Sequence, residues 1–97
     1  MKTNIAYQLA IDLGNGAECR IDANGDKCWY LNGKSHRTDG PAVEFANGNK
    51  YWWLNGKLHR IDGPAAEWAD GYKAWYINGI HYSEEEFDMA KEVLWAI

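Results

Sequence analysis

Two short segments of the sequence combine histidine, arginine and aspartate, which are residue types that could perform catalysis or bind a metal ion. Both segments read His-Arg-x-Asp, with His36, Arg37 and Asp39 in the first and His59, Arg60 and Asp62 in the second. A catalytic centre usually needs one convergent set of groups, whereas this set occurs twice at the same spacing. We therefore interpret both sets as structural, with arginine and aspartate side chains bonding to the backbone of the turn before Gly-Pro.

The sequence has no other pattern that points to catalysis or to a cofactor. It lacks a Gly-rich phosphate loop, a Ser or Cys nucleophile beside a base, and a Cys-x-x-Cys pair. His81 is out of register with the other two histidines because Tyr82 occupies the equivalent position, which argues against a three-histidine metal site. We therefore expect no enzyme activity, no catalytic residue, no cofactor and no metal ion.

The two cysteines, Cys19 and Cys28, flank a turn predicted at the Asn-Gly pair of positions 24 and 25. A two-residue turn there would place Arg20 opposite Trp29 and leave the cysteines as diagonal neighbours roughly 7 to 8 Å apart. That separation is too large for an unstrained disulfide, and neither cysteine has partners at the spacing of a zinc site. We predict that both are packed thiols.

A fixed period organises most of the chain. The tripeptide at positions 31–33, Leu-Asn-Gly, recurs at 54–56 and as Ile-Asn-Gly at 77–79, and both 54 minus 31 and 77 minus 54 are 23. Other residues keep the same register, namely Glu44 and Glu67, Gly48 and Gly71, Lys50 and Lys73, and Trp52 and Trp75. Self-similarity of this kind indicates one supersecondary unit stacked on copies of itself.

Six Asn-Gly or Asp-Gly pairs lie between alternating apolar residues and predict hairpin turns. A type I′ turn requires a positive φ at both central residues, which Asn and Gly tolerate best. The pairs are Asn24-Gly25, Asn32-Gly33, Asn47-Gly48, Asn55-Gly56, Asp70-Gly71 and Asn78-Gly79. We therefore predict a mostly β fold, in which residues 16–82 form an antiparallel meander of stacked β-hairpin repeats.

The segments outside the hairpins differ from each other in pattern. Apolar residues alternate over positions 5–13, which favours a strand within residues 1–15. A short helix is the alternative, because Ala, Gln and Leu are good helix formers. Ser83 and Glu86 form a capping box before apolar residues at three- and four-residue spacing. We predict that residues 83–97 hold a helix, from about Glu84 to Trp95, that caps the stack and completes a single domain of residues 1–97.

Counting outward from Asn47-Gly48 as a two-residue turn divides the side chains between two faces of the sheet. Val43, Phe45, Lys50 and Trp52 fall on one face, which we assign to the core, with Ala66, Trp68 and Trp75 as counterparts. The other face carries aromatic and acidic residues, which we predict as a partner-binding surface: Tyr30, Glu44, Tyr51, Trp53, Glu67 and Tyr76. The alternative is that these aromatic residues form a second core under the terminal segments.

Charge and hydropathy restrict the partners. The formal net charge of −4 argues against binding a nucleic-acid backbone, because that affinity comes mainly from Lys and Arg. No stretch approaches the roughly 18 to 20 apolar residues of a membrane span, and the first residues lack a signal-peptide pattern. We expect a cytoplasmic protein whose partner is another protein, with a homodimer through the C-terminal helix as an alternative because Trp95 and Ile97 lie near the end.

The repeated unit Asn-Gly-Lys-x-His-Arg-x-Asp-Gly-Pro-Ala-x-Glu resembles the MORN-like, YwqK-type repeats of small bacteriophage and bacterial proteins, over about residues 16–82. The resemblance implies stacked β-hairpins and a protein-binding role, as a phage accessory or antitoxin-like inhibitor that blocks a bacterial defence or toxin protein. The ordinary MORN pattern of Tyr-x-Gly is missing, so lipid binding is not implied. Two alternatives are a binder of a nucleotide signal, and a structural or assembly protein.

Overall fold

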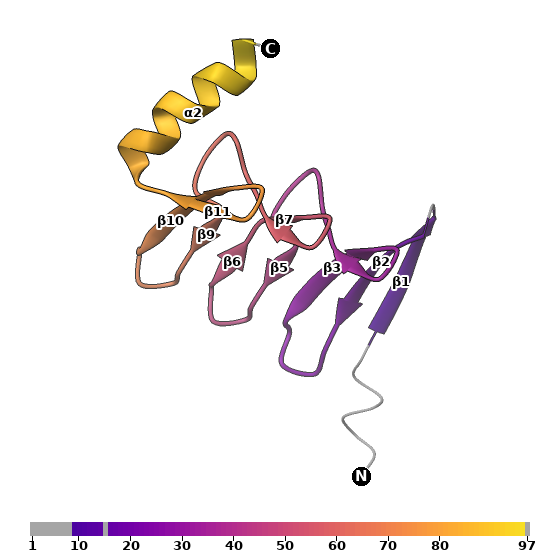
Figure 1. The fold of residues 1–97 in the computed structure, drawn as a ribbon. Coiled ribbons are helices and arrows are strands. Elements are labelled where there is room, and N and C mark those ends of the chain that lie inside the picture. The colour runs from indigo at the N-terminus through magenta and orange to yellow at the C-terminus, as the bar shows by residue number, and fades with distance from the viewer. Residues whose placement is uncertain (1–8, 15, 97) are drawn as a thin grey trace.

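The computed structural model describes residues 9–14 and 16–96, and within them the protein is mostly β with one C-terminal helix (Figure 1). Predictions that concern residues 1–8, 15 and 97 lie outside this part. The longer strands are β1 (Leu9–Gly14), β2 (Ala17–Ile21), β3 (Lys27–Leu31), β10 (Lys73–Ile77) and β11 (Ile80–Tyr82). The two-residue strands are β4 (Lys34–Ser35), β5 (Val43–Glu44), β6 (Lys50–Tyr51), β7 (Trp53–Leu54), β8 (Lys57–Leu58) and β9 (Ala66–Glu67), and the helix is α2 (Glu84–Ala96).

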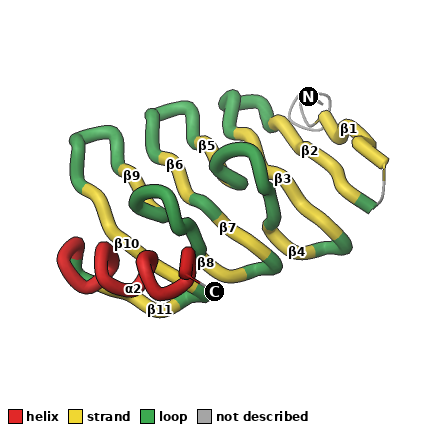
Figure 2. The backbone as a smooth tube through the Cα atoms, turned by 90° about the horizontal axis from the view of Figure 1, so that it is seen from above, coloured by secondary structure: helices red, strands yellow, loops and turns green. Residues whose placement is uncertain are grey.

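Eight strands form one antiparallel sheet in the order β1-β2-β3-β5-β6-β9-β10-β11, and β4 pairs with β3 as a ninth strand. Strands β7 and β8 form a separate two-stranded hairpin between β6 and β9 in the chain. Helix α2 contacts β10 and β11 at the C-terminal end of the sheet (Figure 2). The prediction of a mostly β, antiparallel fold with a C-terminal helix is confirmed, and residues 9–14 form a strand rather than the alternative helix.

Only three of the six predicted turns have type I′ geometry. Asn32, Asn55 and Asn78 have φ angles of 51°, 52° and 51°, and each precedes a glycine that also has a positive φ. In the other three turns, among the described residues, only the glycine has a positive φ, of 87°, 103° and 97° at positions 25, 48 and 71. There the glycine amide donates to the carbonyl three residues earlier, as from Gly48 N to Phe45 O at 2.9 Å. This is a type I turn followed by a bulge at the glycine.

The bulge changes which side chains share a face. Val43 lies opposite Tyr51, and Glu44 lies opposite Lys50, one residue away from the predicted register. Because side chains alternate along a strand, a slip of one residue moves them to the opposite face. The rings of Phe45 and Tyr51 pack edge to face with centroids 5.8 Å apart, so these two residues are on the same side. The prediction that Phe45 belongs to a core face shared with Lys50 is therefore wrong.

A bulge of the same kind, in the turn at Asn24-Gly25, determines on which faces of the sheet the two cysteines lie. Asp22 Oδ1 accepts hydrogen bonds from Asp26 N at 3.1 Å and from Asn24 N at 2.9 Å, which lengthens the turn. Cys19 consequently lies opposite Trp29, so the two cysteines sit on opposite faces of the sheet. Both thiols are free, as predicted, although the register that led to this prediction was one residue off. Burial raises the pKa of the Cys19 thiol, which keeps it protonated.

Among the side chains of residues 16–93, the buried core consists of five small side chains, one isoleucine and one phenylalanine. Its members are Cys19, Ala42, Ala65, Ala66, Ala74, Ile77 and Phe87. Phe87 is the largest fully buried side chain among those described, and the tryptophans at 29, 52, 53, 68 and 75 are half-buried. A sheet with such a thin core must obtain much of its stability from contacts between partly exposed side chains.

The predicted capping box starts helix α2. Ser83 N donates to Glu86 Oε1 at 2.9 Å, and Glu86 N donates to Ser83 Oγ at 3.1 Å. These bonds to Ser83 lower the pKa of the Glu86 carboxyl. Phe87 in the first turn is buried, with 1% of its surface exposed. The helix therefore begins where the sequence predicts and covers the end of the sheet with the first residue of its apolar stripe.

The two kinds of turn predict different responses to the same substitution. Asn55→Ala forces alanine into a positive φ and should lower the free energy of unfolding by about 1 kcal/mol. Asn24→Ala is the matched control, because Asn24 is exposed and does not have a positive φ, and should change it by less than about 0.5 kcal/mol. Urea unfolding measures both values. Equal losses would contradict the assignment of the two turn types.

Candidate functional site

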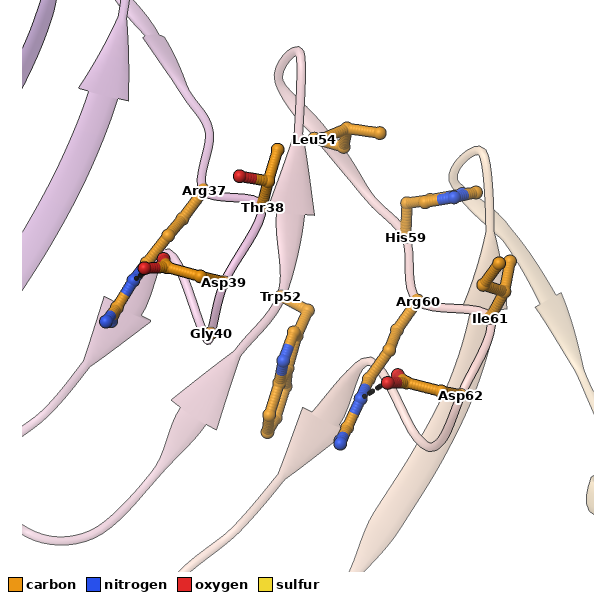
Figure 3. A pocket seen from close by; sticks show the side chains of 10 residues that line it. All are labelled: Arg37, Thr38, Asp39, Gly40, Trp52, Leu54, His59, Arg60, Ile61 and Asp62. Atoms are coloured by element: carbon orange, nitrogen blue, oxygen red, sulfur yellow. Dashed lines mark hydrogen bonds and ion pairs between the residues drawn. The ribbon is translucent and has the colours of Figure 1, made fainter.

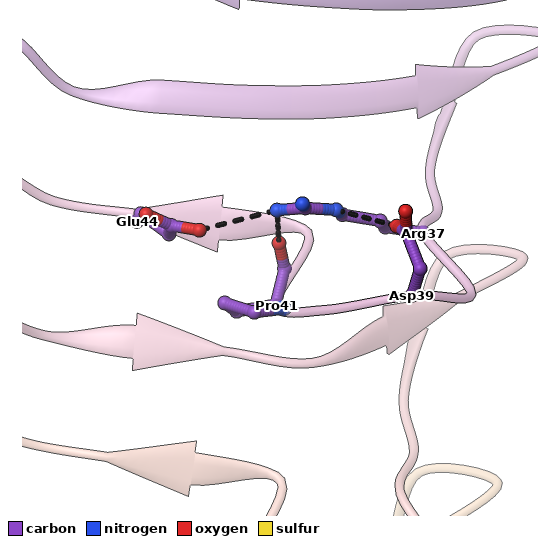
Figure 4. A network of polar contacts seen from close by, with 4 residues as sticks. All are labelled: Arg37, Asp39, Pro41 and Glu44. Atoms are coloured by element: carbon purple, nitrogen blue, oxygen red, sulfur yellow. Dashed lines mark hydrogen bonds and ion pairs between the residues drawn. The ribbon is translucent and has the colours of Figure 1, made fainter.

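Arg37 joins three parts of the chain through one guanidinium group (Figure 4). Its Cζ lies 3.8 Å from the centroid of the Trp29 ring, so the cation is stacked on the indole. Nε donates to Asp39 Oδ1 at 2.8 Å, and Nη1 donates to Pro41 O and to Glu44 Oε2, both at 3.1 Å. Trp29 belongs to β3 and Glu44 to β5, so this set, which we call an arginine clamp, ties two neighbouring strands to the loop between them.

A second arginine clamp of the same composition occurs 23 residues later in the chain. Arg60 Cζ lies 3.9 Å from the Trp52 ring centroid. Nε donates to Asp62 Oδ1 at 2.8 Å, and Nη1 donates to Pro64 O at 3.0 Å and to Glu67 Oε2 at 3.2 Å. The predicted bond from the arginine of each His-Arg-x-Asp set to the backbone of the turn is confirmed, whereas the aspartate carboxylate pairs with the arginine side chain.

Two glycines leave room for the clamped arginines. A Cβ atom added to Gly40 would lie 2.9 Å from Arg37 Cζ, and one added to Gly63 would lie 2.8 Å from Arg60 Cζ. At Gly40 the added atom would be farther from Nε and Nη1, 3.2 Å each, so the glycine approaches the face of the guanidinium rather than its edge. Each guanidinium is therefore enclosed between an indole ring and a glycine backbone.

The two histidines of these sets accept backbone hydrogen bonds from the next tight turn. Asn55 N donates to His36 Nδ1 at 3.0 Å, and Asn78 N donates to His59 Nδ1 at 2.9 Å. Both bonds join residues that are far apart in the sequence, so each histidine links one hairpin to the next. Burial lowers the pKa of His59, which favours the neutral ring that can accept this bond.

Lysine and glutamate alternate across five neighbouring strands at one level of the sheet. The directly opposed pairs are Lys27 with Glu44, Glu44 with Lys50, Lys50 with Glu67, and Glu67 with Lys73. Opposite charges in this arrangement stabilise a sheet. Each glutamate also accepts a hydrogen bond from a clamped arginine. Glu44 and Glu67, which we predicted as an acidic rim for a partner, therefore already form hydrogen bonds within the chain.

Two hollows open beside the clamped tryptophans. The Trp52 hollow, about 470 Å³, lies between the loop with Thr38 and Asp39 and the loop with Asp62 (Figure 3). The Trp29 hollow, about 270 Å³, is lined by Trp29, Leu31, His36, Arg37, Thr38 and Asp39 together with Ala17 and Tyr30. Most of these residues stand 23 positions before residues that line the Trp52 hollow, so the two hollows have related chemistry.

The aromatic residues that sequence reasoning proposed for partner binding have separate neighbours in the structure. The Arg20 guanidinium lies 4.8 Å from the Tyr30 ring centroid, and the Tyr76 ring is 5.1 Å from that of His81. Trp53 pairs with Leu58 in the β7–β8 hairpin. All three aromatic residues are half-buried, and among the side chains of residues 16–93 no ring contact joins them to one another.

Tyr51 instead belongs to a continuous aromatic row that sequence reasoning missed. Its ring centroid is 5.8 Å from that of Phe45 and 5.8 Å from that of Trp68, and Trp68 is 5.1 Å from Tyr72. We call Phe45, Tyr51, Trp68 and Tyr72 the aromatic row. The signal that could have revealed it is the glycine bulge, because the predicted register placed Tyr51 on the face opposite Phe45 and Trp68.

The described residues offer no group of three or more His, Cys, Asp or Glu side chains that could hold a metal ion. No helix in residues 9–14 and 16–96 is both long and apolar enough to cross a membrane. Comparison of the chain with protein-family models, with curated proteins and with solved structures found no match. What the chain can bind must therefore be argued from its own surfaces.

The geometry of the arginine clamp predicts that replacing its arginine by lysine lowers the stability of the protein. Arg60→Lys loses the planar stack on Trp52 and the forked donation, so it should lower the free energy of unfolding by about 1 to 3 kcal/mol. Arg20→Lys is the matched control, since Arg20 also lies over an aromatic ring but is exposed, and should leave the free energy of unfolding almost unchanged. Urea unfolding compares the two variants, and similar losses would show that the clamp contributes little.

The hydrogen bond to His59 predicts a dependence of stability on pH. Since burial lowers the folded pKa of His59 below its unfolded value of about 6.5, the unfolded chain binds more protons between the two values. The contribution of His59 is fully present above pH 6.5 and is lost as the pH falls towards its folded pKa. The variant His59→Asn keeps a neutral acceptor. When the pH falls from 7.5 to 5.5, its free energy of unfolding, measured with urea, should therefore decrease less than that of the native protein. An identical pH profile would refute this role.

Proposed function

We propose that the protein is a non-enzymatic protein-binding module, built from stacked β-hairpin units that follow the period of the sequence. Hydrogen bonds that recur with this period support the repeat: Trp29 N donates to Ala42 O at 2.7 Å, and Trp52 N donates to Ala65 O at 2.7 Å. The two arginine clamps and the two histidine bonds recur with the same period. Stacked units of this kind present extended surfaces that suit binding to other proteins.

The observation that carries this proposal is the aromatic row. Tyr72 is 67% exposed and Phe45 is 38% exposed, yet they are connected through the rings of Tyr51 and Trp68. Aromatic rings are enriched in the energetically dominant parts of protein interfaces, because they bury a large area at a low cost in side-chain entropy. A row of four packed rings with two exposed ends is thus a preformed docking surface.

We also propose that the partner is a bacterial host or toxin protein, which the chain would block as an antitoxin-like inhibitor. The support for this finer statement is the resemblance of the repeated unit to MORN-like repeats. The net charge of −4 favours a partner with a basic surface over a nucleic acid. No enzymatic step is needed for such a role, since inhibition by binding only requires that the partner's site be covered.

A second candidate surface comes from helix α2 and the neighbouring strand. Ile80, Met89 and Val93 are large apolar residues that are exposed at this end of the molecule. Exposed apolar side chains that lie together can mark a contact between proteins. Self-association through this end would suit the alternative role as a structural or assembly protein.

The two surfaces can be separated with a pair of double variants. Phe45→Ala with Tyr72→Ala should abolish capture of a partner from a bacterial lysate, lowering the retained amount by at least about tenfold, because it removes both exposed rings. Met89→Ala with Val93→Ala is the matched control, since it removes exposed apolar side chains elsewhere and should retain the partner. The measurement is a pull-down with quantitative mass spectrometry, after circular dichroism has shown that both variants fold.

Retention by both double variants would reject the aromatic row as the docking surface. Loss only with the helix variant would move the interaction to α2, and sedimentation of the purified chain would then show whether the partner is a second copy.

A further inference from the structure

Strand β10 has an outer edge that is paired over only part of its length. Residues 27–28 of β3 pair with β2 on one side and with β5 on the other, and residues 50–51 of β6 pair with β5 and with β9. In the described part of the chain, Lys73 and Ala74 pair with β9 alone, because β11 begins its pairing with β10 at Trp75. We call the unpaired side of Lys73 and Ala74 the open edge.

Helix α2 leaves the open edge accessible. In Figure 1 the helix rises from the end of β11, and the turn that joins β9 and β10 lies on the opposite side of the sheet. Figure 2 likewise shows this turn and the helix at opposite ends of β10. Gly71, Tyr72 and Lys73, which lie at the turn end of the strand, are exposed. A further strand could therefore approach the open edge without displacing the helix.

The open edge interrupts the alternation of lysine and glutamate across the sheet. Lys50 lies opposite Glu44 on one side and Glu67 on the other. Lys73 is exposed, lies opposite Glu67 alone, and takes part in none of the ion pairs among the side chains of residues 16–93. Glu67 also accepts a hydrogen bond from Arg60 at 3.2 Å, so its charge is shared. An acidic residue opposite Lys73 would continue the alternation and add a favourable cross-strand pair.

The two strands that join equivalent edges show which side chain fits beside Ala74. Where β5 joins β3, Val43 lies opposite Cys28, and where β9 joins β6, Ala66 lies opposite Tyr51. At both junctions a larger side chain faces a smaller one. Because alanine is small, a branched apolar residue such as valine fits opposite Ala74 and fills the space beside it.

The glycine of the turn between β9 and β10 lacks the neighbour that the two earlier bulged turns have. A Cβ atom added to Gly25 would lie 3.7 Å from Ala46 Cβ, and one added to Gly48 would lie 3.2 Å from Ala69 Cβ. One added to Gly71 would have no described atom within 4 Å. Each of these alanines stands two positions after the glutamate of its strand. An incoming strand with the same spacing would place a small residue over Gly71.

We propose that the open edge binds an extended, acidic segment of the partner protein, which adds to the sheet as a strand antiparallel to β10. The segment has a branched apolar residue opposite Ala74, glutamate opposite Lys73, an aromatic residue opposite Tyr72, and alanine over Gly71. β5 and β9 join the sheet in this antiparallel way. Backbone bonds of an added strand supply affinity, and alternate side chains supply specificity. This inference rests on the proposed function and names the kind of segment that reaches the Tyr72 end of the aromatic row.

The probe for the open edge is the peptide Gly-Pro-Ala-Val-Glu-Phe-Ala-Asn-Gly, which copies residues 40–48 and carries this pattern. The control peptide has lysine in place of its glutamate. Fluorescence anisotropy with the full native chain should show the acidic peptide binding about tenfold more tightly, because the exchange turns attraction to Lys73 into repulsion. Binding should also slow amide hydrogen exchange at residues 72–74, since an added strand covers backbone groups that an ion pair alone leaves exposed.

Reversal of the charge at residue 73 tests the location of the site. Lys73→Glu should weaken binding of the acidic peptide by about tenfold and should favour the lysine peptide. Lys27→Glu is the matched control, because Lys27 is also exposed and opposite a glutamate but already has strands on both sides. It should bind both peptides like the native protein. Circular dichroism shows whether the two variants fold.

The variant Phe45→Ala separates the open edge from the rest of the aromatic row. Phe45 follows β5, which two strands separate from β10 in the sheet, so this variant should bind the acidic peptide normally. Peptide binding with the properties above would uphold the open edge even if the pull-down rejected the aromatic row as the docking surface.

Equal affinity of the native chain for the two peptides would overturn the proposal, as would the absence of binding or unchanged exchange at residues 72–74. An equal loss of binding in Lys27→Glu would place the peptide elsewhere. A native dimer that Lys73→Glu dissociates in sedimentation would also overturn it, because a second copy would then occupy the edge.

Discussion

The stacking of an arginine on a tryptophan is the interaction on which the rest of this structure depends. Most of its middle strands are two residues long, and the buried side chains among residues 16–93 are those of four alanines, Cys19, Ile77 and Phe87. Backbone pairing over such short strands cannot hold neighbouring hairpins in place. Each clamped guanidinium contacts an indole in or directly after one strand, the carboxylate of a neighbouring strand and the loop between them. The glycines after the clamps are part of the same constraint, because a Cβ atom there would displace the arginine.

The C-terminal end of the sheet has no arginine at the position where the 23-residue spacing would place one. Arg37 and Arg60 are 23 residues apart, and the residue 23 positions after Arg60, at 60 plus 23, is Ser83. No guanidinium is therefore available at that position to clamp Trp75, and Ser83 instead caps helix α2. The helix places Phe87 against the end of the sheet and covers it. The segment Arg-Ile-Asp-Gly-Pro at positions 60–64 is thus replaced, 23 positions later, by Ser-Glu-Glu-Glu-Phe at positions 83–87, which begins the helix.

The clamps also determine how the two sides of the sheet differ. On one side the charges are engaged with one another, and the exposed carboxylates border hollows with indole rings inside. On the other side the bulged turns bring Phe45, Tyr51, Trp68 and Tyr72 into ring contact. The protein therefore presents one polar, grooved surface and one aromatic surface, and these differ in the partners that they can bind.

The sequence by itself determined the mostly β fold, the positions of the turns and the start of the helix, because Asn-Gly pairs and a capping box act locally. It also indicated the structural role of Arg37 and Arg60. The tertiary structure alone decided the register, since whether Asn47-Gly48 forms a two-residue turn or a bulged one depends on backbone bonds across the hairpin. This shift of one residue in the strand register places Tyr51 on the same face as Phe45, and Glu44 on the same face as Arg37. The composition of each surface therefore could not be predicted from sequence periodicity.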